Sequence, residues 1–158
     1  MRMLAPLVLS LCLYGCSPVW TAEVDALLNA GAPHFASRIK NSTQDYRRDL
    51  AEVILGPVEM SAEWSKRFDD ALLEIGRSRG NEKYACTPDP GVRVRIQDGV
   101  EFADVLLCFE CWTLHIENEQ GDIVVEMTPF DSKKVELADL VIEAFPSDKE
   151  LAKFVKRK

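Results

Sequence analysis

Residues 92–127 alternate between apolar and polar side chains, and this alternation constrains the fold more than any other feature of the sequence. A period of two residues is typical of a β-strand that turns one face toward a core. Two turn signals, Asp98-Gly99 and Gln120-Gly121, interrupt the alternation, and Asp-Gly between apolar segments is a strong hairpin signal. We therefore predict an antiparallel β-meander of about four strands.

The position of the first turn also predicts which residues pair across the hairpin. A turn at Asp98-Gly99 places Val92 opposite Val105 and Val94 opposite Ala103. One face then carries apolar side chains and a cysteine: Val92, Val94, Ile96, Ala103, Val105, Leu107, Phe109 and Cys111. The other face carries Arg93, Arg95 and Asp104, with Arg93 opposite Asp104, and is predicted to be the wetter one.

The apolar pattern changes parity after Cys111, because Trp112, Leu114 and Ile116 all have even numbers. A slip of one residue would turn every following side chain to the opposite face of the sheet. We therefore predict a β-bulge or a kink around Cys111-Trp112. The second turn, at Gln120-Gly121, then pairs Ile116 with Val125 and Leu114 with Met127.

Helices are predicted before the meander. The first spans residues 23–30, and the second spans residues 62–75, with Ser61 as its N-cap and Gly76 as its stop. The buried stripe of the second helix comprises Trp64, Phe68, Leu72 and Ile75. Between the two helices, residues 34–50 are polar and weakly patterned, and residues 53–55 form a short strand.

Two further helices are predicted after the meander. Ser132 caps the first, and its apolar residues recur at the spacing of a core-facing stripe: Leu137, Leu140, Val141, Ala144 and Phe145. Ser147 and Glu150 form a capping box for the last helix. The predicted fold class is α+β, an antiparallel sheet with the N-terminal and C-terminal helices packed on one face.

The N-terminus carries a signal for export. Arg2 precedes an apolar run over residues 4–13, which is too short to span about 30 Å of hydrocarbon but suits a signal peptide. The run ends in Leu13-Tyr14-Gly15-Cys16, which resembles the lipobox of bacterial lipoproteins. The resemblance implies that a diacylglycerol is attached to Cys16, that the peptide is cut before it, and that the new amino group is acylated with a fatty acid such as palmitate.

This resemblance implies the organisation of the whole chain: a signal peptide over residues 1–15, the lipidated cysteine and a linker over 16–22, and a single domain over 23–158. Ser17 after the cysteine implies delivery to the outer membrane, facing the periplasm. The lipid on Cys16 is then the membrane anchor. The alternative is an ordinary signal peptide, cut after Gly15, whose cysteine is incidental.

The charge of the chain excludes one class of partner. The formal net charge is −7, and removal of Arg2 with the leader makes the mature chain one unit more negative. Such a surface repels nucleic acid phosphates and offers no basic stripe to neutralise them. Nucleic acid is therefore not an expected partner. The lipid anchor that the lipobox resemblance implies makes the membrane a partner, and another protein of the envelope is a possible second one.

Three cysteines remain in the mature domain: Cys86, Cys108 and Cys111. Export to an oxidising compartment predicts a disulfide between two of them. Cys108 and Cys111 have the spacing of thiol oxidoreductases, but three residues of strand separate their Cα atoms by roughly 10 Å, and a disulfide needs about 7 Å or less. The first hairpin's register places Cys86 opposite Cys111, so we predict this pair, which stabilises by roughly 3 kcal/mol. The alternative partner of Cys86 is Cys108.

The same cysteines with His115 also have a spacing that zinc sites tolerate, which gives Cys86, Cys108, Cys111 and His115 as an alternative metal site. The sequence contains no signature of a hydrolase or a phosphate-binding loop. We therefore predict no catalytic residues and no cofactor other than the lipid. The predicted function is a non-enzymatic protein-binding module of inhibitor or immunity type, with a cysteine-based zinc or thiol-redox protein as the alternative.

Overall fold

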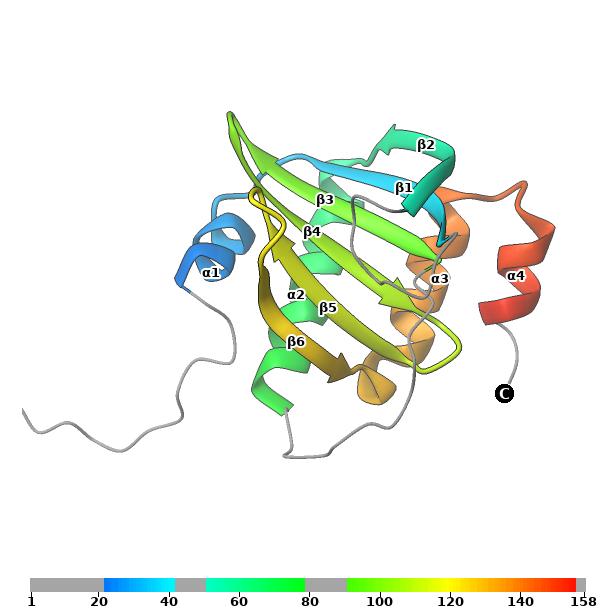
Figure 1. Ribbon diagram of the computed structural model, residues 1–158. Coiled ribbons are helices and arrows are strands. Elements are labelled where there is room, and N and C mark those ends of the chain that lie inside the picture. Colours follow the sequence, from blue (N-terminus) through cyan, green and yellow to red (C-terminus); the bar gives the residue numbers. More distant parts are fainter. Residues whose placement is uncertain (1–21, 42–50, 79–90, 156–158) are drawn as a thin grey trace, which may run out of the picture.

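The computed structural model describes residues 22–41, 51–78 and 91–155, which fold into an antiparallel sheet covered by helices (Figure 1). The helices are α1 (Ala22–Asn29), α2 (Ala62–Ser78), α3 (Lys134–Ala144) and α4 (Lys149–Val155), with the short 3₁₀ helix η2 (Asp131–Lys133) before α3. The strands are β1 (His34–Asn41), β2 (Ala51–Glu59), β3 (Val92–Asp98), β4 (Glu101–Cys108), β5 (Thr113–Asn118) and β6 (Ile123–Pro129). The predicted α+β class is confirmed.

The sheet has the strand order β2-β1-β3-β4-β5-β6, and every neighbouring pair is antiparallel. Helices α2 and α3 lie behind the sheet in Figure 1, and α1 lies beside the tips of the β3–β4 and β5–β6 hairpins. The apolar face of the sheet packs with residues of all four helices in one core. In this part of the chain, no helix is long and apolar enough to cross a membrane.

The prediction of about four strands was wrong, because the described residues alone contain six. Residues 34–41, predicted to be weakly patterned, form β1. The bent strand predicted through Cys111 is two strands, β4 and β5, joined by a turn over residues 109–112. Trp112 has a φ of 55° in this turn, and so the chain reverses there rather than continuing through a bulge.

The register of the first hairpin differs from the prediction by two residues. Val94 pairs with Val105, and Arg95 rather than Arg93 lies opposite Asp104. The loop consists of Gly99 and Val100, with Gly99 at a φ of 61°. Because side chains alternate with a period of two, a shift of two residues leaves each side chain on its predicted face.

The second hairpin follows its predicted register only at its centre. Ile116 pairs with Val125 as predicted, whereas Leu114 pairs with Thr128 rather than with Met127. The register shifts between these two positions, so β6 holds one residue more than β5 there.

Helix α2 begins as predicted, because the Trp64 amide donates a hydrogen bond to Ser61 Oγ at 3.2 Å. It continues past Gly76 to Ser78, so the predicted stop was wrong. Its predicted stripe is buried, with Trp64 1% exposed and stacked on Phe68. The Trp64 indole N–H donates to the Leu140 carbonyl oxygen at 2.9 Å, which joins α2 to α3.

The other two predicted caps were wrong. Ser132 lies within η2, and α3 begins without a side-chain cap. At α4, the Leu151 amide donates to Asp148 Oδ1 at 2.9 Å, so Asp148 takes the capping role predicted for Ser147. The same carboxylate accepts a hydrogen bond from Arg38 of β1 at 3.2 Å, which fixes α4 beside the sheet.

Candidate functional site

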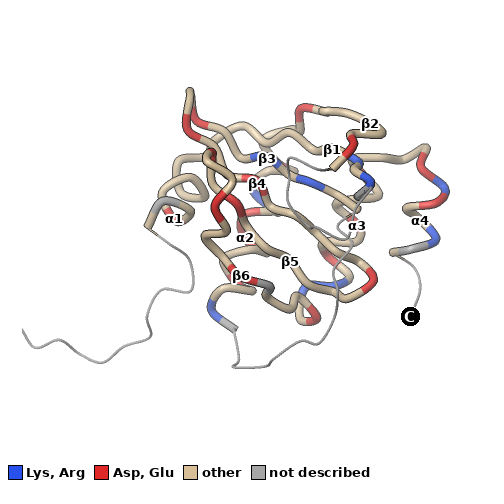
Figure 2. The backbone as a smooth tube through the Cα atoms, in the orientation of Figure 1, with Lys and Arg blue, Asp and Glu red and all other residues tan. Residues whose placement is uncertain are grey.

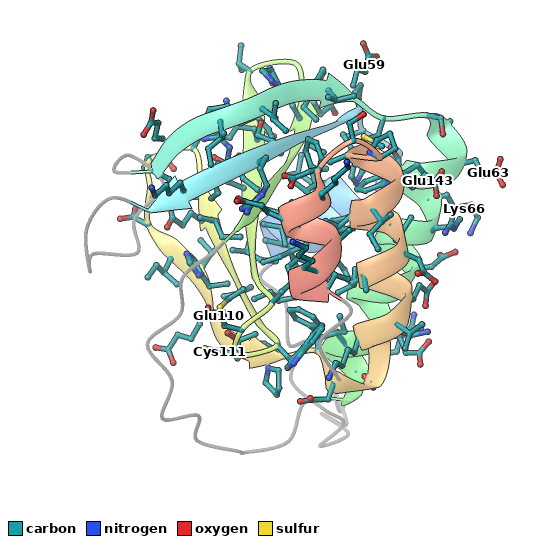
Figure 3. The ribbon with its side chains drawn as sticks, turned by 90° about the vertical axis from the view of Figure 1, so that its right-hand side faces the viewer. Glu59, Glu63, Lys66, Glu110, Cys111 and Glu143 are labelled. Carbon is teal, nitrogen blue, oxygen red and sulfur yellow. The ribbon has the colours of Figure 1, made fainter. Side chains whose placement is uncertain are left out.

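The structure describes only some of the predicted site residues. Cys16 and Cys86 lie outside the described residues. Cys108 is the last residue of β4 and is a buried thiol, whereas Cys111 is disulfide-bonded in the turn that follows (Figure 3). The observed register of β3 and β4 no longer places Cys86 opposite Cys111, so that argument for the pair was wrong, and the pairing itself stays a prediction.

The Cys108-Cys111 segment lies at a turn rather than inside a strand, which corrects the strand spacing used to separate the two sulfurs. His115, the fourth residue of the alternative zinc site, lies on β5 and is 5% exposed. Its Nε2 atom is 3.1 Å from Glu117 Oε1. Over residues 22–41, 51–78 and 91–155, no three His, Cys, Asp or Glu side chains form a group that could hold a metal ion.

The face of the sheet opposite the helices carries a bidentate ion pair. Arg95 Nε and Nη2 donate to the two carboxylate oxygens of Asp104, each at 2.8 Å. Asp104 is fully buried, and it lies opposite Glu117 of β5 in the register. The hydrogen bond with Asp104 raises the pKa of the Arg95 guanidinium above its ordinary value. This arrangement fastens β3 to β4.

A second buried pair joins β1 to α2. His34 is fully buried, and its Nε2 atom lies 2.8 Å from Asp69 Oδ1, while Nδ1 lies 2.7 Å from the Ala32 carbonyl oxygen. A carbonyl oxygen only accepts, so Nδ1 carries a proton and donates it. Both ring nitrogens are therefore engaged. Asp69 and Ser65 of α2 both line a cleft of about 550 Å³.

Strand β2 is the outermost strand of the described sheet on the β1 side (Figure 1). Every residue from Glu52 to Glu59 is exposed. The exposed residues include four aliphatic side chains, with exposures between 41% and 49%: Val53, Ile54, Leu55 and Val58. Single exposed aliphatic residues are common, whereas four on one edge strand offer an apolar surface that another protein could cover. We call these four residues the β2 aliphatic segment.

The backbone of β2 departs from that of a regular edge strand. Its register with β1 shifts twice, so β2 holds more residues than the strand beside it, as at a β-bulge. Gly56 lies within the first shift, between Leu55 and Val58, at a φ of 96°, and a Cβ atom at this position would come 2.6 Å from the Ala36 carbonyl oxygen. Only glycine fits there. Pro57 follows and has no N–H to donate, so the hydrogen-bonding edge is interrupted in the middle of the strand.

Carboxylates lie at both ends of the β2 aliphatic segment. Glu52 and Glu59 are exposed, and Figure 2 shows acidic residues at both ends of the strand. Glu63 follows at the start of α2, and Figure 3 shows Glu59 and Glu63 pointing away from the body of the protein. Two cations of α2 are paired, Lys66 with Asp70 at 2.6 Å and Arg67 with Glu143 at 2.9 Å. Lys40 of β1 is exposed and lies opposite Glu52 in the register. The surface around β2 is therefore apolar at its centre and acidic at its ends.

Sequence reasoning predicted a strand at residues 53–55 but not that it would be exposed. A short aliphatic run predicts a buried strand as readily as an exposed one. Comparisons of the chain with known proteins add nothing to this geometry: no family model matches it, and neither a curated protein nor a solved structure does.

Proposed function

We propose that this protein is a lipid-anchored, non-enzymatic module of the cell envelope that binds another protein through β2. The observation that supports the proposal is the β2 aliphatic segment, four exposed aliphatic side chains on the outermost strand of the sheet. An exposed sheet edge accepts an extended segment of a partner, whose backbone forms hydrogen bonds on either side of the interruption at Pro57 and whose side chains cover the apolar surface.

The area of β2 is sufficient to contribute to binding but small for a permanent complex. Full burial of an aliphatic side chain contributes roughly 1.5–3 kcal/mol, and these four side chains are already about half covered. The remaining gain is therefore a few kcal/mol, to which backbone hydrogen bonds along the edge add. This magnitude suits a transient contact with a partner.

The anchor is proposed to be the lipid on Cys16. Replacement of Cys16 by serine is expected to abolish incorporation of labelled palmitate, because no other acylation site is predicted. The variant should also be released from membranes, because multiple acyl chains make such anchoring stable. The measurement is metabolic labelling followed by membrane fractionation, with Cys108→Ser as the matched control. A C16S variant that still labels and stays with the membrane would overturn the proposed anchor.

Photo-crosslinking in intact cells tests the role of β2. A photo-crosslinking residue in place of Ile54 is expected to give one discrete protein adduct. The same residue in place of Val135, which is 73% exposed on α3, is the matched control and should give none. A second substitution in the same chain, Val53→Lys, is expected to remove the adduct, because a charge then lies in the apolar contact.

A further inference from the structure

The ends of β2 indicate the chemistry of its partner. Glu52 precedes the β2 aliphatic segment and Glu59 follows it, and both are exposed. We propose that the partner contributes an extended segment with an apolar centre and a lysine or arginine at each end. This inference rests on the proposed function of β2 and names the class of partner that it binds. Opposite charges on adjacent strands attract, and like charges directly opposite each other repel.

A second copy of the chain does not fit this surface. Two copies related by a two-fold axis pair antiparallel, so that each end of one strand meets the other end of its copy. Overlaying the two aliphatic segments therefore brings Glu52 of one copy to Glu59 of the other, at both ends of the contact. Two like-charged carboxylate pairs oppose such a dimer, whereas a segment with basic ends turns both contacts into ion pairs.

The two ends of β2 differ in how strongly they attract a positively charged partner residue. Lys40 of β1 lies opposite Glu52 in the register and is exposed, so it offsets part of the negative charge at that end. Glu59 lies opposite Phe35 and is followed by Glu63 at the start of α2. Lys66, the cation nearest in sequence, is engaged by Asp70. The Glu59 end is therefore the stronger attractor, and loss of its charge should weaken binding more than loss of Glu52.

Binding of synthetic peptides to the full chain in detergent micelles tests the inference. Three peptides as long as the segment from Glu52 to Glu59 share a centre of alternating valine and threonine and end in lysine, glutamine or glutamate. The lysine peptide is expected to bind about tenfold more tightly than the glutamate peptide, with the difference shrinking as salt is added. Fluorescence anisotropy of labelled peptides measures the dissociation constants.

Charge reversal on the protein gives the matched comparison. The double variant Glu52→Lys with Glu59→Lys is expected to invert the order and prefer the glutamate peptide. Glu101→Lys with Glu126→Lys changes the net charge equally at exposed positions on β4 and β6 and should keep the original order. If the control inverts the order as well, net charge rather than β2 selects the peptide, and the inference is wrong.

The remaining outcomes separate this inference from the proposed function. If the three peptides bind equally and Val53→Lys abolishes all binding, β2 docks strands without regard to charge. The proposed function then stands and the inference falls. If no peptide binds, the inference is overturned, and crosslinking at Ile54 decides the proposed function separately. If the partner's crosslinked segment carries no basic residue, the inference is likewise overturned.

Discussion

Replacement of Asp104 by alanine is expected to lower the free energy of unfolding by about 3 kcal/mol, near the lower end of the range for breaking a buried ion pair. The Asp104 side chain is fully buried, and both its oxygens accept from Arg95 at 2.8 Å. The variant leaves the guanidinium without this partner beside the ring of Phe102, over which it lies at 3.9 Å. Arg95 keeps 30% exposure, and contact with water limits the loss.

Urea denaturation followed by tryptophan fluorescence measures this change. The matched control is Asp70→Ala, which removes an exposed pair in which Lys66 is 75% and Asp70 is 59% exposed. Exposed pairs contribute about 0–1 kcal/mol, so the control should change stability little. Equal destabilisation by the two substitutions would contradict the expectation that the buried Arg95–Asp104 pair stabilises the fold more than an exposed pair does.

The direction of the Arg95 pKa shift predicts the response of this pair to alkaline pH. The hydrogen bond with Asp104 raises the pKa of Arg95 above its ordinary value. A group whose pKa is higher when folded stabilises fully below its unfolded pKa and loses that contribution only as pH rises through the folded pKa. For arginine that window lies above about pH 12. The stability difference between the wild type and D104A should therefore not change between neutral pH and about pH 10.

Replacement of Trp64 by alanine is expected to lower the free energy of unfolding by about 3–5 kcal/mol. The indole is 1% exposed, stacks on Phe68 with ring centroids 5.1 Å apart, and donates to the Leu140 carbonyl oxygen. Its removal opens a cavity between α2 and α3 and deletes the hydrogen bond that joins them. Because small domains are stable by only about 5–15 kcal/mol, this variant should be largely unfolded when warmed.

Far-ultraviolet circular dichroism during thermal and urea unfolding measures this loss without relying on the deleted fluorophore. Val135→Ala, which shortens an aliphatic side chain on the exposed side of α3, should change stability by less than about 0.5 kcal/mol. Trp64→Phe should lie between the two, because it keeps a ring against Phe68 but loses about 1 kcal/mol with the N–H donor. Equal stability of W64A and V135A would contradict the assigned core.

The helices were the part of the fold that the sequence predicted best, because their apolar stripes are long and periodic. Trp64, Phe68 and Leu72 of α2 are buried as expected. The first hairpin was predicted with the correct faces but a register two residues off, for a physical reason. A glycine with positive φ suits the second loop position of a type I′ turn and the first position of a type II′ turn. Gly99 occupies the first loop position, as in a type II′ turn, and the alternating pattern of the strands is compatible with both turn types.

Strand β1 could not be predicted from its residues alone. Two of its buried positions hold polar side chains, His34 and Ser37, where a buried strand normally shows apolar residues. Burial of His34 is stabilised by Asp69, which lies on α2 and far along the chain. The same limit applies to β2, because the sequence of a strand does not state whether another element covers it. Contacts with other elements, rather than local β-propensity, determine that β1 is buried and that β2 is exposed.

Site-specific photo-crosslinking in intact cells tests whether β2 is the surface that contacts another protein. A discrete adduct is expected from the position of Ile54, with its loss on Val53→Lys, and no adduct is expected from the more exposed control position at Val135. Adducts of equal yield from Ile54 and Val135, or an adduct from Val135 alone, would contradict this role of β2.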